Sequence, residues 1–220
     1  MPIMLALFLM TSLSLVQSHS IGKTPDWIAA ALATPPKGTS SKLPEAIISE
    51  LFAGINKDNA DKATPHLAFN TEEEARAWLD AMSPRLQKHI KDRLTREDFL
   101  VTAHYEAKRA GIDPQLILGL IQVVSGFQKN KLSKHNARGY MQVNAKWIQL
   151  IGSDSHNLFH LRTNLRYGCT ILRNLLDVNT GDLYKALTAY GADIDPSFGL
   201  SSSEFPSQVV RAWQANWTFP

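Results

Sequence analysis

The chain has 220 residues, a formal net charge of +3 and 20% charged residues. Its 44% hydrophobic content is enough to fill the core of one sizeable domain and excludes wholesale disorder. No run of lysines or arginines indicates a surface for nucleic acid, so we expect no nucleic acid among the partners. We also expect no cofactor. The single cysteine, Cys169, excludes an intramolecular disulfide. It shares an apolar stripe with Leu165, Leu172 and Leu176, so we expect a buried, unreactive thiol.

Residues 1–20 have the pattern of a signal peptide. The stretch 3–16 is almost wholly apolar, and the polar residues Gln17 to Ser20 follow it. This length suits a signal-peptide core and is short for a membrane span, although no lysine or arginine precedes it. We therefore expect a periplasmic or secreted protein that meets the membrane only through this segment. The alternative is an uncleaved amphipathic or buried segment.

Residues 21–70 read as an N-terminal linker that contains one short helix. The run Thr-Pro-Pro-Lys-Gly-Thr-Ser-Ser at 34–41 is typical of a loop. A helix is predicted at 45–55, where Ile48, Leu51, Phe52 and Ile55 share a face. The polar stretch 56–70 is predicted to be irregular.

From residue 71 to residue 220 the sequence predicts one mostly α domain. Thr71 and Glu74 have the spacing of a capping box at a helix start. A second helix is predicted to start at 95–98 and to stop near Gly111. Asp113 and Pro114 open a third helix, which ends at 125–126. Further helices are expected at 164–178, after 182, and at about 206–217, and no βαβ alternation or internal repeat is present.

Three sequence motifs in this region carry a family resemblance. Val124-Ser125 ends the third predicted helix, residues 135–143 read His-Asn-Ala-Arg-Gly-Tyr-Met-Gln-Val, and residues 190–192 read Tyr-Gly-Ala. Together they resemble the lytic transglycosylases, lysozyme-like enzymes that cleave the MurNAc-GlcNAc bond of bacterial peptidoglycan. The resemblance covers about residues 71–217 and is most specific in 105–191. It implies a helical, lysozyme-like fold of the goose-type lysozyme and lytic transglycosylase kind.

The same resemblance implies a glycan-binding groove whose catalytic acid is missing. In the family the residue at position 124 is the glutamate that serves as the only acid/base, and here it is Val124. Tyr190 matches a tyrosine that reaches toward that acid, and Gly191 stands where the family has asparagine. The remaining groove positions implied by the resemblance are Ser125, Gly139, Tyr140, Met141 and Gln142. Taken alone, the helical pattern interprets Val124 as one more core residue, on a face with Leu116, Ile117, Leu120 and Ile121.

Three functions follow as hypotheses. The first is a cell-wall protein that binds peptidoglycan glycan strands, with cleavage lost or much reduced. The second is an active lytic transglycosylase that uses a displaced acid, such as Asp193 or Glu204. The third is a non-enzymatic subunit that binds an envelope protein partner through residues 21–55. Glu106 is expected to be a structural partner for a buried arginine or a backbone amide, and the spacing around His104 and His135 predicts no metal site.

Overall fold

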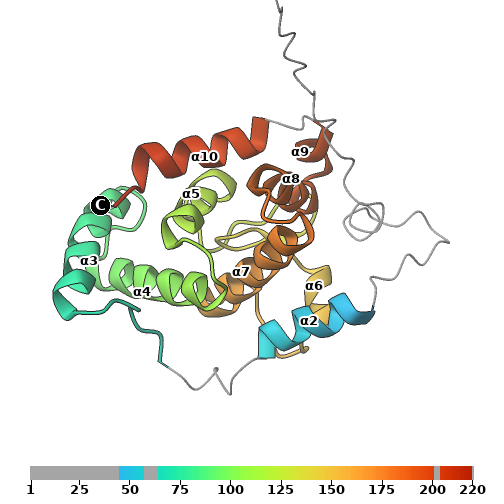
Figure 1. Ribbon diagram of the computed structural model, residues 1–220, viewed down its shortest axis with the longest axis horizontal. Helices are drawn as coiled ribbons and strands as arrows, with labels where there is room; N and C mark the ends of the chain where they lie inside the picture. Colours follow the sequence, from blue (N-terminus) through green and yellow to red (C-terminus); the bar gives the residue numbers. More distant parts are fainter. Residues whose placement is uncertain (1–44, 57–63, 201–203, 220) are drawn as a thin grey trace, which may run out of the picture.

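The computed structural model describes residues 45–56, 64–200 and 204–219, and nearly all its regular structure is helical (Figure 1). The predicted signal segment and the loop at 34–41 lie outside the described residues. The elements are α2 (Glu45–Asn56), α3 (Glu72–Leu86), α4 (Arg93–Arg109), α5 (Pro114–Val124), β1 (Ala137–Arg138), β2 (Val143–Asn144), α6 (Lys146–Ile151), α7 (Leu161–Val178), α8 (Leu183–Ile194), α9 (Pro196–Leu200) and α10 (Glu204–Asn216). The two short strands pair antiparallel as a hairpin. The mostly α fold class is confirmed.

Helix starts follow local capping chemistry, with one wrong prediction. The Thr71 hydroxyl accepts a hydrogen bond from the Glu74 amide at 3.2 Å, as the capping pattern predicts. Asp113 caps α5 in the same way. The start predicted at 95–98 is wrong, because Asp92 caps α4 and the helix begins at Arg93. The Asp92 carboxylate accepts from both the amide and the hydroxyl of Thr95, so the threonine cannot act as the cap itself.

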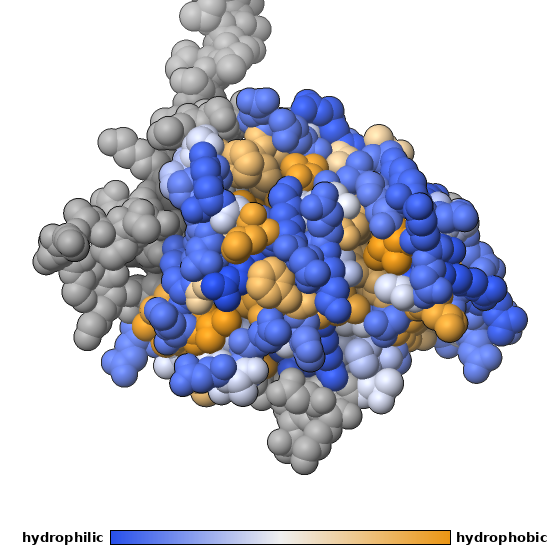
Figure 2. Space-filling view, turned by 180° about the vertical axis from the view of Figure 1, so that it is seen from behind, coloured by the Kyte–Doolittle hydropathy of each residue, from blue (hydrophilic) through white to orange (hydrophobic). Residues whose placement is uncertain are grey.

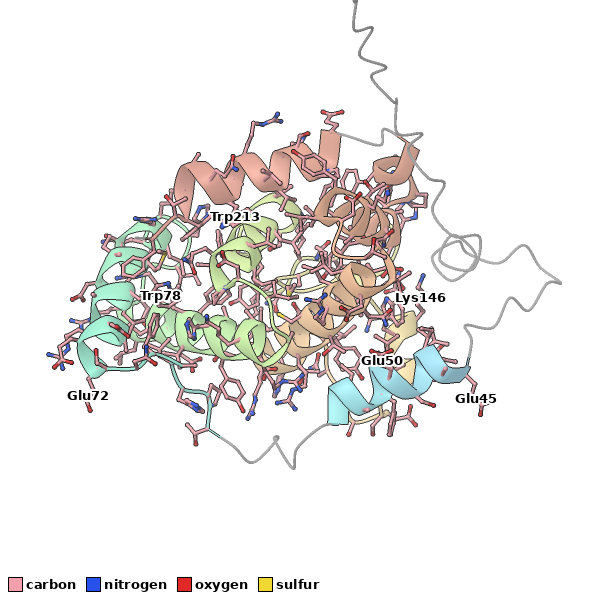
Figure 3. The ribbon with its side chains drawn as sticks, in the orientation of Figure 1. Glu45, Glu50, Glu72, Trp78, Lys146 and Trp213 are labelled. Carbon is pink, nitrogen blue, oxygen red and sulfur yellow. The ribbon has the colours of Figure 1, made fainter. Side chains whose placement is uncertain are left out.

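α5 lies at the centre of the molecule, and α10 packs along it (Figure 1). A Cβ atom at Gly119 would lie 2.8 Å from the backbone nitrogen of Trp213, so the two helices approach more closely than any side chain at 119 would allow. Figure 3 shows Trp213 on α10 at the edge facing the body of the protein. Burial of both helices therefore depends on their mutual contact.

The C-terminal residues are attached to two other helices. An Arg85 guanidinium nitrogen on α3 donates to the carbonyl oxygens of Asn216 at 3.0 Å and Thr218 at 2.8 Å. The indole of Trp217 donates to the side-chain oxygen of Gln122, on α5, at 2.7 Å. These bonds fix the end of α10 to both α3 and α5.

α2 is packed into the body of the protein. The predicted helix at 45–55 is confirmed, and its residues Leu51 and Ile55 are each only 2% exposed. Its Gly54 carbonyl accepts a hydrogen bond from Arg109 at 2.8 Å. Phe52, in contrast, stays half exposed. Leu51 and Ile55 of α2 are therefore buried against the rest of the protein, whereas Phe52 is not.

The face of the protein seen from behind is largely hydrophilic. On this face, hydrophobic residues form small separate patches among hydrophilic ones (Figure 2). Within 45–56, 64–200 and 204–219, no helix is both long enough and apolar enough to cross a membrane.

Candidate functional site

Hydrogen bonds join the hairpin turn to α7 and α8. The Tyr190 hydroxyl donates to the Met141 carbonyl oxygen at 2.9 Å. The Met141 amide in turn donates to the Asn164 side-chain oxygen at 2.8 Å. Tyr190 is buried, and this burial raises the pKa of its phenol well above the usual value. In this arrangement Tyr190 is a neutral donor that holds the turn in place.

The turn itself is built around Gly139 and Gln142. Gly139 has a φ of +74°, and a Cβ there would lie 2.6 Å from the Leu158 carbonyl oxygen, so only glycine fits. The Gln142 side-chain amide donates to the carbonyl oxygens of Lys131 at 3.1 Å and Gly139 at 2.9 Å. Both residues therefore stabilise the hairpin turn in this structure.

Val124 closes α5 as a buried, apolar residue. Its side chain is 5% exposed and belongs to the same continuous core as Met141 and Tyr190. The neighbouring Ser125 is also buried, and its hydroxyl donates to the Ile121 carbonyl at 3.1 Å. Tyr140 packs against Phe99, with 4.9 Å between the ring centres. Val124, Tyr140, Met141 and Tyr190 thus all belong to the one hydrophobic core, in which Tyr190 is bonded to the hairpin and Val124 supplies only apolar surface.

An aromatic pair occupies the space beside Gly191. The rings of Phe198 on α9 and Phe205 on α10 stack at 5.1 Å between centres and 10° between planes. A Cβ at Gly191 would lie 2.6 Å from the Phe205 ring and 3.2 Å from the Phe198 Cβ. The position where the resemblance places asparagine therefore has no room for a side chain. Sequence reasoning did not find this pair, because it left the chain between α8 and α10 without a predicted element.

Restoring asparagine at this position is expected to destabilise the protein. Gly191→Asn should lower the free energy of unfolding by about 1–3 kcal/mol, because the new side chain overpacks the Phe198–Phe205 pair. Chemical denaturation would measure the change. Gly111→Asn is the matched control: the backbone there has a φ of +67°, which asparagine tolerates, and no atom lies within 4 Å of the added Cβ. Equal stability of the two variants would contradict the packing described here.

Asp193 and Glu204, the two acids considered as replacements, have different surroundings. One Asp193 carboxylate oxygen accepts from the Trp147 indole at 2.6 Å, and the other pairs with the Lys146 ammonium at 2.6 Å. Asp193 is also buried, at 7% exposure. Glu204 is exposed in the first turn of α10, where it accepts from Gln208 at 3.3 Å. Asp193 therefore serves to join α8 to α6.

Glu106 is the fully buried centre of an ion-pair cluster. Its carboxylate contacts Arg109 at 3.0 Å, Arg166 at 3.1 Å and Arg162 at 3.3 Å. The three arginines come from α4 and α7, so the cluster joins these two helices. The structural role predicted for Glu106 is confirmed. The buried state predicted for Cys169 is confirmed too, and burial raises the pKa of its thiol.

Three hollows on the described part of the protein have volumes of about 300, 540 and 480 Å³. The first lies between α2 and α7, the second beside the start of α5, and the third beside the hairpin and α6. Neither Val124 nor Tyr190 contributes to the walls of any of these three.

Comparison with known families decides the identity of the central region. Residues 102–194 match the family model of the Transglycosylase SLT domain. This part of the chain is a transglycosylase SLT domain. No curated protein and no solved structure matches the chain.

The SLT domain runs from within α4 to the last residue of α8. It contains Val124, the hairpin turn and Tyr190, whereas Phe198 and Phe205 lie outside the match. The domain gives the chain a lytic-transglycosylase-like function related to peptidoglycan, as the motifs predicted.

Proposed function

We propose that this protein binds the glycan strands of peptidoglycan in the bacterial cell envelope and cleaves them poorly or not at all. The observation that carries the proposal is Val124, a buried apolar residue at the end of α5 in an SLT domain. The retained Gly139, Gln142 and Tyr190 support an intact hairpin scaffold for glycan contact. The predicted signal segment supports a periplasmic or secreted location.

The loss of cleavage follows from the chemistry at position 124. A single acid in these enzymes must protonate the glycosidic oxygen and then accept a proton from the attacking hydroxyl of the sugar. Valine has no exchangeable proton and can do neither. Removing a positioned acid costs roughly 10²–10⁴-fold in rate for the acid/base contribution alone. The apolar packing beside Gly191 supports the same conclusion, because a second polar group of the family's groove is also replaced.

The surroundings of the nearby acids argue against substitute chemistry. Both carboxylate oxygens of Glu106 contact arginines, and both oxygens of Asp193 contact Lys146 or Trp147. Both oxygens of each of these carboxylates are therefore already paired with other side chains of the protein. Glu204 is the remaining candidate for the alternative of a displaced acid, and it is solvent-exposed. Of the two acids named for this role, Asp193 and Glu204, only Glu204 is solvent-exposed and without a buried ion pair.

Binding and cleavage can be measured on the same purified sacculi. We expect the protein to sediment with sacculi and to release no anhydro-muropeptides in a chromatographic assay. Glu204→Gln is the control for a displaced acid, and it should bind sacculi as the unmodified protein does. Product release that Glu204→Gln abolishes would establish the displaced-acid enzyme instead. If the protein fails to sediment with sacculi, the glycan-binding proposal is wrong, and a search for an envelope protein partner becomes the next step.

A further inference from the structure

The hollow of about 540 Å³ lies at the end of α5 opposite Val124. Val124 is the tenth residue after Pro114 on the helix, which corresponds to about 15 Å along its axis. Three of the hollow's ten lining residues lie outside the matched family region, namely Phe69 before α3, Trp78 on α3 and Phe219 near the C-terminus. Its lining includes Phe69, Trp78, His104, Lys108, Asp113 and Phe219.

Trp78 supplies a hydrogen-bond donor that lacks an acceptor. Its side chain is 1% exposed and lies on the inner side of α3 (Figure 3). Among the described residues, no atom accepts a hydrogen bond from its indole nitrogen. Buried N–H groups without a partner are rare in folded proteins, and each one calls for an explanation. A ligand with a carbonyl oxygen would provide the missing acceptor.

Aromatic rings and a neutral imidazole surround this donor. Phe69 stacks on His104 at 4.8 Å between ring centres, and Trp78 meets the His104 ring edge-on at 5.0 Å. Burial, together with the charges of Lys108 and His66, lowers the pKa of His104 to about 4, so the imidazole is uncharged at neutral pH. The interior of the hollow therefore carries no formal charge.

The rim of the hollow is polar and electrically balanced. Lys108 and Asp113 carry opposite charges, and Gln115 adds an amide. An aromatic interior with a few polar groups suits a neutral ring that has apolar C–H faces and hydroxyls at its edge. A purely anionic or cationic ligand would meet a like charge at this rim.

We propose that this hollow binds one N-acetylated hexosamine ring of a peptidoglycan glycan. The sugar ring lies beside Phe69 and Phe219, and its acetamido carbonyl accepts the hydrogen bond from the Trp78 indole. Because that nitrogen is closed to solvent, the side chains that cover it have to move aside when the sugar binds. The inference rests on the proposed glycan binding and adds a second contact point outside the family's groove.

Nuclear magnetic resonance can test the site directly. The chain has five tryptophans, and Trp78→Phe identifies which indole N–H signal belongs to Trp78. Titration of the full chain with N-acetylglucosamine should shift this signal saturably, whereas glucose, which lacks the acetamido group, should not. Phe219→Ala should weaken binding of N-acetylglucosamine several-fold. Tyr184→Ala, an exposed aromatic on α8, is the matched control and should leave the titration unchanged.

The outcomes separate this site from the proposed function. An unmoved Trp78 signal in a protein that still sediments with sacculi overturns the second site and leaves glycan binding intact. Shifts confined to the amides around Gly139 have the same meaning. Equal responses to N-acetylglucosamine and glucose overturn recognition of the acetamido group. Failure of both the titration and sedimentation with sacculi removes the proposed function as well.

Discussion

Glu106→Gln is expected to lower the free energy of unfolding by about 3–5 kcal/mol, because it leaves buried arginines without their counter-ion. The Arg166 side chain is 5% exposed and that of Arg109 12%, so water cannot replace the lost carboxylate. Glutamine keeps the shape of the side chain and removes only the charge. For a protein of this size, such a loss corresponds to a fall of roughly 10 °C in the melting temperature.

The control for this variant is an exposed ion pair of similar composition. Glu97 pairs with Arg93 at 2.7 Å on the surface of α4, where the arginine is 78% exposed. Glu97→Gln should change stability by no more than about 1 kcal/mol. Calorimetry and urea denaturation of both variants would measure the difference. Similar small losses in the two would show that the three arginines find other acceptors and that Glu106 is not the centre of the cluster.

Val124→Glu is expected to lower stability by roughly 3 kcal/mol at pH 7, because it places a carboxyl group in an apolar part of the core. Burial raises the pKa of the introduced acid above the value of about 4.3 that it has in the unfolded chain. The folded state then holds its proton more tightly than the unfolded state does. Stability of the variant relative to the unmodified protein should therefore fall as the pH rises above about 4.3.

Urea denaturation of Val124→Glu and the unmodified protein between pH 4 and pH 8 measures this difference. Val124→Leu, which stays apolar, should show no such pH dependence. The same variant also tests the function: we expect it to release anhydro-muropeptides from sacculi, while the unmodified protein releases none. If Val124→Glu neither lowers stability nor makes stability depend on pH, position 124 faces solvent. If the variant releases no product from sacculi, the Phe198–Phe205 packing has closed the groove.

Local signals in the sequence predicted much of the helical framework. Thr71, Asp113 and Asp182 each satisfy amides within their own helix turn, so a few neighbouring residues are enough to predict the helix start. The predicted start of α4 was wrong because two residues three positions apart, Asp92 and Thr95, could both cap the helix. Pattern alone does not rank a carboxylate above a hydroxyl when both precede a helix.

The long-range features could not be predicted to the same extent. The type of partner for Glu106 was predicted, but not which residues would meet it. Arg162 and Arg166 lie 56 and 60 residues further along the chain. Nothing in the local sequence indicates that they meet it. The Phe198–Phe205 pair depends on how α9 folds back on α8, and its effect on Gly191 is visible only in three dimensions. The glycan-contact roles of Ser125, Tyr140 and Met141 stay predictions, to be tested on sacculi.

The close contact between Gly119 and Trp213 means that the folding unit extends beyond the region that matches the family model. The family match ends at Ile194, yet the helix that covers α5 begins ten residues later. A gene fusion or truncation that transmitted only residues 102–194 would remove both α3 and α10 and would leave the central helix α5 uncovered. α10 therefore belongs to the same folding unit as the domain that it covers.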